Sequence, residues 1–219
     1  MKSQGSEEDL EHEMDDSDDE DNYFNDYYDN NIEDQEMDYN KKEDPEYFDY
    51  KLLKVEDVER MLNEMVEALC TSIHIQPSLA KMMLYASNWD VTKMASQYKA
   101  NPAKILADCR LTPEPNAIAK QDTTARHQTC PVCMQRQPTE ALHSVACGHL
   151  FCRDCWHMHF QVQIQNGITT GLECMARDCE ILVPEDFVLS MVTNTKLRDK
   201  YQMFSFSDQV KSHPELRFC

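Results

Sequence analysis

Apolar residues between positions 52 and 110 recur at three- and four-residue steps, the spacing that gathers side chains on one face of an α-helix. The first predicted helix starts near Leu52. Glu56 and Asp57 lie in its first turn, where the helix dipole favours negative charge. Its expected inward stripe consists of Val55, Val58, Met61, Leu62, Met65, Val66 and Leu69.

Three shorter amphipathic helices are predicted after the first one. Pro77 opens the second helix, Asp90 is suited to cap the third, and Asn101-Pro102 begins the fourth. Short helices joined by tight turns predict a compact bundle over residues 51–110. Its expected inward residues are Leu79, Met82, Met83, Ala86, Val91, Met94, Ala95, Tyr98, Ile105, Leu106 and Cys109, with Cys70 as a further small core residue.

The helical pattern stops after the bundle and returns near the end of the sequence. Residues 111–129 contain turn signals and no periodicity, which predicts a linker. Residues 181–219 form a second, helical linker, in which residues 184–187 enter one helix and a long helix runs from Thr195 to about Ser212. The expected inward residues of the long helix are Leu197, Tyr201, Phe204 and Val210.

The formal net charge of −19 is concentrated at the start of the chain. Residues 1–50 hold 21 acidic and three basic side chains, whereas the remainder holds 19 acidic and 18 basic ones. Self-repulsion and low burial predict a disordered, solvated acidic tail. An acidic and aromatic strip that binds a basic partner is the alternative. The folded part lacks a basic patch, which argues against nucleic-acid binding.

The cysteines indicate metal rather than disulfides. No signal peptide is visible, and no apolar run approaches the roughly 20 residues that cross a membrane. We therefore expect a cytoplasmic or nuclear protein whose thiols stay reduced. Ten cysteines in such a protein point to metal binding.

Seven cysteines and one histidine form four ordered pairs of donors. Structural zinc sites use four thiolate or imidazole donors, and a Cys-x2-Cys turn brings two thiolates onto one ion. Eight donors therefore suffice for two zinc ions, with consecutive or interleaved pairing. The pairs are Cys130-x2-Cys133, Cys147-x-His149, Cys152-x2-Cys155 and Cys174-x4-Cys179.

The segment Cys147-Gly-His-Leu-Phe-Cys152 resembles the RING finger signature, including the aromatic residue before the fifth ligand. This resemblance implies a cross-braced C3HC4 RING with two zinc ions over residues 130–180. It assigns Cys130, Cys133, Cys152 and Cys155 to the first zinc ion, and Cys147, His149, Cys174 and Cys179 to the second.

Two features depart from an ordinary RING. Four residues separate Cys174 from Cys179, and Glu180 stands where ordinary RINGs often place an arginine that locks the E2–ubiquitin conjugate. Both features match the first RING of RING-between-RING (RBR) ligases. The phrases Cys-Pro-Val-Cys-Met, Phe-Cys-Arg-Asp-Cys-Trp and Pro-Glu-Asp-Phe-Val, together with the order of tail, bundle, linker and RING, resemble ariadne-type RBR E3 ubiquitin ligases, most of all their second branch.

The resemblance implies a small multi-domain fold that is mainly α-helical and contains a zinc-bound module. Its parts would be a disordered acidic tail, a ubiquitin-associated-like (UBA-like) helical bundle, a cross-braced two-zinc RING finger and a C-terminal helix. In this family the first RING recruits a ubiquitin-loaded E2 conjugating enzyme, and a second RING carries the catalytic cysteine.

Several expectations about function follow from the same resemblance. The chain would recruit the E2, contain no catalytic residue of its own, and have neddylated cullin–RING ligases as further partners. Cys219 falls where the first ligand of the in-between-RING domain is expected. A non-catalytic adaptor, or a competitive inhibitor that binds an E2 or a neddylated cullin–RING ligase, is the alternative. An ordinary single-RING ligase is disfavoured by Glu180.

The resemblance also assigns E2 contacts, position by position, to Val132, Trp156, His159 and Met175. For Trp156 the alternative is packing in the core, and for Val132 it is a surface position without a role. Because closed zinc sites supply much of the stability of a small module, chelation is expected to unfold residues 130–179 and leave the bundle largely intact.

Overall fold

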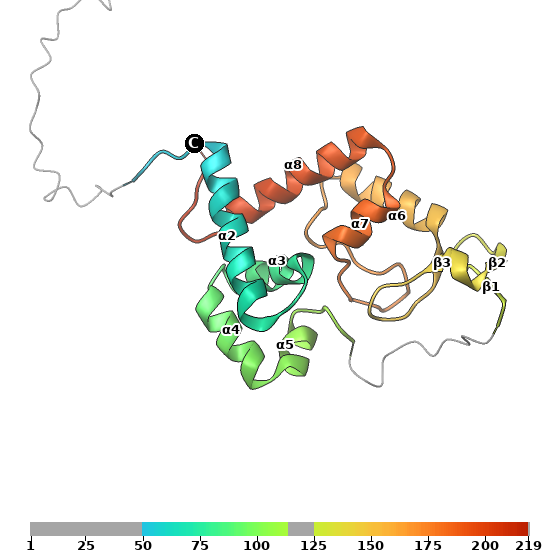
Figure 1. Cartoon of the computed structure of the whole chain (residues 1–219). Coiled ribbons are helices and arrows are strands. Elements are labelled where there is room, and N and C mark those ends of the chain that lie inside the picture. The colour runs from blue at the N-terminus through green and yellow to red at the C-terminus, as the bar shows by residue number, and fades with distance from the viewer. Residues whose placement is uncertain (1–49, 114–124, 219) are drawn as a thin grey trace, which may run out of the picture. The chain divides into compact units, whose positions relative to one another are not determined.

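The computed structural model describes residues 50–113 and 125–218 (Figure 1). The predicted acidic tail up to residue 49, residues 114–124 of the predicted linker and Cys219 lie outside this description. The chain divides into two units at Leu52, and the described helices and strands belong to the second unit. None of the described helices is long and apolar enough to cross a membrane.

The four predicted helices of the bundle are present (Figure 1). They are α2 (Val55–Ile73), α3 (Pro77–Ala86), α4 (Val91–Ala100) and α5 (Pro102–Asp108). Helix α2 ends because His74 adopts a left-handed conformation with φ 56°, and its N–H donates to the Cys70 carbonyl at 2.8 Å.

The predicted starts of α4 and α5 are confirmed by their caps, whereas α2 begins at Val55, three residues after the predicted start near Leu52. The Asp90 carboxylate accepts from the Lys93 N–H at 2.8 Å, and the Asn101 amide oxygen accepts from the Lys104 N–H at 3.1 Å. Pro77 and Pro102 occupy the starts of α3 and α5, where a missing N–H has no cost. Local chemistry therefore sets where α3, α4 and α5 begin.

The core of the bundle corrects two expectations. Val55 is 56% exposed in the first turn of α2, and Ala86 is exposed at the last residue of α3, so neither joins the core. After Ala86 the chain turns through Asn88 and Trp89, with φ 53° and 63°. This turn places Trp89 inside instead. The buried bundle residues are Val58, Leu62, Val66, Leu69, Ile73, Ala80, Met83, Leu84, Trp89, Met94, Ala95, Cys109 and Leu111.

The cysteine module, residues 125–192, begins with two short antiparallel strand pairs. Strand β1 (His127–Thr129) pairs with β2 (Arg136–Pro138), and β3 (Leu142–His143) pairs with β4 (Phe151–Cys152). A 3-10 turn, Thr139–Ala141, lies between β2 and β3. The predicted linker over residues 111–129 is therefore too long at its end, because residues 127–129 gain backbone partners in β2.

Helix α6 (Arg153–Gln165), helix α7 (Glu185–Met191) and helix α8 (Thr195–Ser212) complete the described structure (Figure 1). The predicted bounds of α8 are confirmed, and its predicted inward residues Leu197, Tyr201 and Val210 are buried. Phe204 is only half-buried, whereas Ser205 and Gln209 are buried. The inward face of α8 is thus more polar than its sequence suggested.

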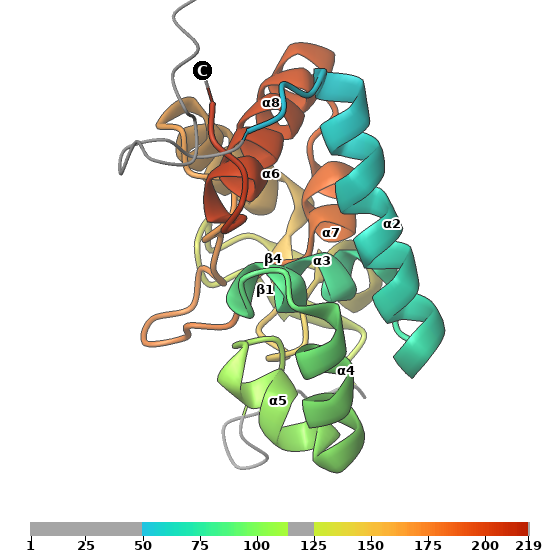
Figure 2. The same cartoon turned by 90° about the vertical axis from the view of Figure 1, so that its left-hand side faces the viewer.

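Helix α8 contributes to two hydrophobic cores. Leu197 and Tyr201 pack in the core of the cysteine module, whereas Val210 belongs to the core of the bundle. The last turns of α8 lie against the bundle in both views (Figure 1, Figure 2). The Trp89 indole N–H donates to the Ser212 hydroxyl at 2.8 Å, which adds a polar tie across this junction.

Acidification is expected to weaken the junction at the end of α8. His213 is buried against the Trp89 ring, with ring centroids 6.2 Å apart, and burial lowers its pKa while Glu215 partly opposes this. The unfolded chain then binds a proton more readily than the folded one, so stability is complete above about pH 6.5 and falls below it.

Melting curves at pH 7.5 and pH 6 provide the measurement. The melting temperature of the zinc-loaded chain is expected to fall at the lower pH, and His213→Gln to reduce that fall. An equal fall in the variant would mean that other groups carry the pH dependence.

Candidate metal centres

The eight predicted donors gather into two groups of four. The first group is Cys130, Cys133, Cys152 and Cys155, and the second is Cys147, His149, Cys174 and Cys179. Within each group the donor atoms all lie within 4.8 Å of one another. Pairs one and three along the chain meet in the first group, and pairs two and four in the second. The structure thus has interleaved pairing, which the spacing alone had left open.

The first group is built around a turn and a helix start. Cys130 and Cys133 lie in the turn between β1 and β2, which closes through the Met134 N–H donating to the Cys130 carbonyl at 2.9 Å. Met134 adopts the left-handed conformation there, with φ 59°. Cys152 ends β4 and caps α6, and Cys155 lies in the first turn of that helix.

The sulfur positions of the first group match a tetrahedral metal site. The Cys130 and Cys155 sulfurs are 3.8 Å apart, and so are those of Cys133 and Cys152. Four sulfurs about 2.3 Å from one zinc ion lie about 3.8 Å apart at the corners of a tetrahedron. A disulfide would hold two sulfurs about 2.0 Å apart. The spacing is therefore that of zinc ligands.

The second group joins two loops. Gly148, with φ 79°, lets the chain turn between Cys147 and His149, a conformation that costs glycine little. Cys174 follows α6, and its N–H donates to the Ile181 carbonyl at 3.0 Å, which brings Cys179 back toward it. The Cys174 sulfur lies 3.7 Å from His149 Nδ1, close to the separation of about 3.6 Å for sulfur and nitrogen on one tetrahedral zinc ion.

The acid–base properties of both groups favour a bound cation. Burial opposes ionisation of Cys130, but backbone N–H donors outweigh it and lower its pKa to about 6, whereas burial and neighbouring thiols raise the pKa of Cys155. In the second group a hydrogen bond with Cys174 lowers the pKa of Cys147 to about 5, and the same pairing raises the pKa of Cys174. Adjacent thiolates repel one another, so full deprotonation needs a cation such as Zn²⁺ between them.

Trp156 is a core residue of the module, which corrects its assignment as a partner contact. It is 0% exposed, and its indole N–H donates to the His143 carbonyl at 3.0 Å. Its ring lies 5.0–5.4 Å, centroid to centroid, from those of Phe151, Phe160 and Phe187. Trp156 thus holds α6 against the strands and α7, and a partner cannot reach it.

The other three predicted contact residues line one groove beside the first group. Val132, His159 and Met175 face a groove of about 650 Å³. Val132 is 54% exposed, which leaves its side chain free for a partner. His159 is half-buried, and its Nε2 lies 3.1 Å from the Glu173 carbonyl. Burial lowers the pKa of His159, so the neutral ring is favoured.

Two exposed apolar residues of this groove were not predicted from the sequence. Met158 and Val162 line it from α6 and are 55% and 49% exposed. They lie four residues apart, so they share one face of the helix. The sequence did contain a signal for them. They form an apolar pair on the face of α6 opposite the buried Trp156, Phe160 and Ile164.

Two of the described cysteines, Cys70 and Cys109, lie outside both donor groups. Burial raises the pKa of both Cys70 and Cys109. Only a thiolate is an effective nucleophile, so a raised pKa disfavours covalent chemistry at either residue. Cys219, predicted as a ligand of a further domain, lies outside the described residues.

Comparison with known proteins identifies relatives of the chain. Residues 55–109 match the family described as E3 ubiquitin-protein ligase ARIH2, N-terminal UBA domain. The chain is 37% identical over 167 residues to E3 ubiquitin-protein ligase ARIH2 of Mus musculus, with 76% of this chain and 34% of that protein covered. It is 33% identical over 171 residues to potential E3 ubiquitin-protein ligase ariadne-2 of Caenorhabditis elegans, with 76% and 35% covered.

Similarity extends more weakly to the ariadne-1 proteins. The chain is 26% identical over 175 residues to E3 ubiquitin-protein ligase ARIH1 of Homo sapiens, with 77% of this chain and 31% of that protein covered. It spans about a third of the length of each of these relatives. The bundle matches the ARIH2 family and the identity is higher to the ariadne-2 sequences than to ARIH1, so the relatives of this chain are ariadne-type E3 ubiquitin ligases, with the ARIH2 branch the more similar one.

Proposed function

We propose that this chain is the recruiting part of an RBR E3 ubiquitin ligase, in which a two-zinc RING docks a ubiquitin-loaded E2. The observation that carries the proposal is the groove beside the first cysteine group. There the exposed side chain of Val132 lies next to the ligand Cys133, and Met158 and Val162 extend the apolar surface along α6.

The zinc ions would be structural. Each group offers four protein donors, which fill a tetrahedral zinc ion and leave no position for a substrate. The first zinc ion would fix the turn that carries Val132 against the start of α6. The metal thereby orients the groove and takes no part in ubiquitin transfer.

The groove suits a protein partner better than a small molecule. Val132, Met158 and Val162 are each about half exposed on one open surface. Clustered, exposed apolar side chains mark protein interaction sites, whereas scattered ones need no explanation. An E2 is the partner that relationship to ARIH-type ligases supports.

Recruitment rather than direct transfer is proposed for the described residues. Their cysteines either belong to the two groups or have a raised pKa, so none is suited to accept ubiquitin as a thioester. The side chain of Glu180 is 78% exposed and presents an acid where ordinary RINGs place an arginine. A cysteine elsewhere in the whole protein would accept ubiquitin. A neddylated cullin–RING ligase would be a further partner.

Binding of a ubiquitin-loaded E2 tests the proposal. Val132→Ala is expected to weaken binding by about tenfold, because truncating a central apolar anchor costs about 1–2 kcal/mol. The matched control is Val55→Ala, since Val55 is 56% exposed on α2 and Val132 is 54% exposed. Affinities for a panel of ubiquitin-loaded E2 enzymes would be measured on zinc-loaded chains.

Single-turnover discharge of the same E2 to free lysine separates the competing functions. Binding without discharge, lost in Val132→Ala and kept in Val55→Ala, supports a recruiting RING. Rapid discharge would show an ordinary RING ligase instead. Absence of binding to every E2, with both zinc ions bound, would exclude E2 recruitment and leave an adaptor that binds a cullin–RING ligase.

A further inference from the structure

We propose that the cavity between the helical bundle and the cysteine module is a binding site for a small, uncharged ligand with an apolar body and one hydrogen-bond acceptor. The cavity has a volume of about 290 Å³. It is lined by helices α3 and α8, by the segments 109–110, 169–171 and 182–183, and by Glu185. It is separate from both cysteine groups and from the groove that contains Val132.

One wall of the cavity is a buried polar stripe on α8. Tyr201, Ser205 and Gln209 recur every fourth residue and are 3%, 5% and 6% exposed. This spacing places them on one helix face. Residues buried in a helix at such positions are usually apolar, and buried polar groups need partners. A polar stripe that faces a cavity is therefore a feature of a binding site rather than of a core.

The Tyr201 hydroxyl is the polar group of this stripe that makes no hydrogen bond with a described residue. The Gln209 amide donates to the Ser205 hydroxyl at 3.0 Å, whereas the Tyr201 hydroxyl has no hydrogen bond with any residue that the structure describes. Among those residues no fully buried side-chain nitrogen or oxygen lacks a partner. The Tyr201 oxygen must therefore reach open space, and the space that this side chain lines is the cavity.

The protonation state of Tyr201 supports its role as a donor. Burial raises its pKa, and the carboxylates of Glu185 and Asp186 add to the effect. The hydroxyl thus keeps its proton at neutral pH. A ligand that uses it must offer an acceptor, such as an amide carbonyl.

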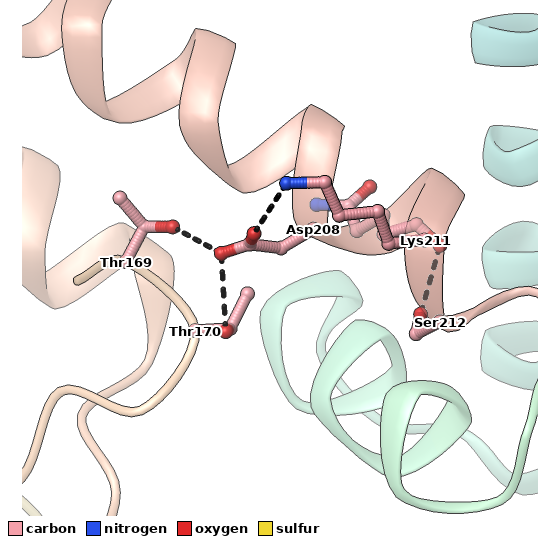
Figure 3. A network of polar contacts seen from close by, with 6 residues as sticks. Thr169, Thr170, Asp208, Lys211 and Ser212 are labelled. Atoms are coloured by element: carbon pink, nitrogen blue, oxygen red, sulfur yellow. Dashed lines mark hydrogen bonds and ion pairs between the residues drawn. The ribbon is translucent and has the colours of Figure 1, made fainter. Parts of the chain in front are cut away.

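The second wall is held in place by a polar network (Figure 3). The hydroxyls of Thr169 and Thr170 point toward the Asp208 carboxylate and donate to the same oxygen, at 2.9 and 3.3 Å. Lys211 lies 4.0 Å from the other oxygen of Asp208. These contacts fix residues 169–171 against α8, so this wall is formed before a ligand binds.

The charges at the cavity exclude an ionic ligand. Lys81 of α3 pairs with Glu185 at 2.7 Å, and both side chains are mostly buried. Arg110 pairs with Glu173 at 2.8 Å. The cations are thus already neutralised. The remaining wall is apolar and includes Met82 and Val183, which suits an aromatic or branched aliphatic body.

Titration of the zinc-loaded chain with acetanilide, followed by amide NMR shifts, tests the site. Acetanilide carries an aromatic ring and one amide carbonyl. Saturable shifts are expected at residues 169–171, with a dissociation constant on the order of 1 mM for a ligand of this size. Tyr201→Phe is expected to weaken binding about fivefold, the effect of one hydrogen bond. The matched control Tyr98→Phe, on α4 outside the cavity, is expected to leave it unchanged.

A second variant keeps the test decisive if Tyr201→Phe disturbs folding. Gly171 lines the cavity, and a Cβ atom added there meets no atom within 4 Å. Gly171→Leu should therefore fold and block the site. N-acetyl-leucinamide serves as a peptide-like probe, and tighter binding of it than of acetanilide would point to a peptide source of the ligand. Absence of saturable shifts with both probes, or equal binding by Gly171→Leu, would overturn the proposal.

Discussion

Removal of zinc by a chelator is expected to unfold the cysteine module. Cys130, Cys147, Cys152 and Cys174 are themselves members of its hydrophobic core. Without a cation the thiolates cannot remain together, so the core loses its centre. The free energy of zinc binding in zinc-finger peptides is about 10–16 kcal/mol, as large as the whole stability of a typical domain.

Metal content and tryptophan emission would measure this effect. Two zinc ions per chain are expected before chelation, and loss of either one should expose Trp156, the central side chain of the module. Cys147→Ser should have the same effect on the second site while the chain is still saturated with zinc. A module that keeps a buried Trp156 after complete loss of zinc would contradict the proposed structural role of the metal.

The bundle is expected to stay helical after zinc removal but to melt at a lower temperature. Helix α8 belongs to both cores, because Leu197 and Tyr201 pack in the module and Val210 packs in the bundle. When the module unfolds, α8 loses the packing partners of Leu197 and Tyr201. The contacts of Val210 with the bundle would then weaken. This refines the expectation, drawn from sequence alone, of a bundle that chelation leaves largely intact.

The chain has two tryptophans, which makes the two parts separately measurable. Trp156→Phe leaves Trp89, in the bundle core, as the only tryptophan. Its emission should remain that of a buried indole after chelation, with a lower melting temperature. If chelation removed the buried-indole emission of Trp89 as well as that of Trp156, the bundle and the module would be one cooperative unit. An unchanged melting temperature would show that α8 adds nothing to the stability of the bundle.

Trp156→Ala is expected to destabilise the module by about 3–5 kcal/mol, the usual cost of removing a large buried aromatic side chain. Its indole packs on three phenylalanine rings and donates to the His143 carbonyl, so the substitution leaves both a void and an acceptor without its partner. Thermal or chemical unfolding followed by circular dichroism gives the measurement.

The control lies two residues further along α6. Met158→Ala removes a side chain that is 55% exposed, and should change stability by less than about 0.5 kcal/mol. Partner binding should show the reverse order of effects. It would be measured at low temperature, where Trp156→Ala is still folded. There Met158→Ala should weaken E2 binding and Trp156→Ala should not. The reverse result would place Trp156 in the interface and refute its assignment to the core.

Local features of this chain could be read from its sequence because their causes lie within a few residues. Asp90 and Asn101 accept hydrogen bonds from residues three positions ahead, so the starts of α4 and α5 needed no knowledge of the rest of the fold. The periodicity of residues 195–212 likewise gave α8 with its observed bounds. The four donor pairs were visible because each is a short turn.

Which residues meet across the chain was decided only by the tertiary structure. Spacing allowed two pairings of the donors, and in the fold the donor atoms of the interleaved pairing are the ones that meet. Resemblance to a family placed Trp156 on a surface, but the phenylalanines around it come from β4, α6 and α7. Trp89, in a segment that reads as a helix break, is buried because the chain turns inward there.

The cavity between the bundle and the cysteine module shows most clearly what could not be predicted from the sequence. Tyr201, Ser205 and Gln209 have the spacing of a helix face, but nothing local tells a buried polar stripe from a solvated one. Burial depends on what lies opposite, and here the opposing groups come from α3 and from residues 169–171. The sequence by itself determined the helices, their caps and the donor pairs. The tertiary structure decided their partners, because contacts between distant segments depend on the whole fold.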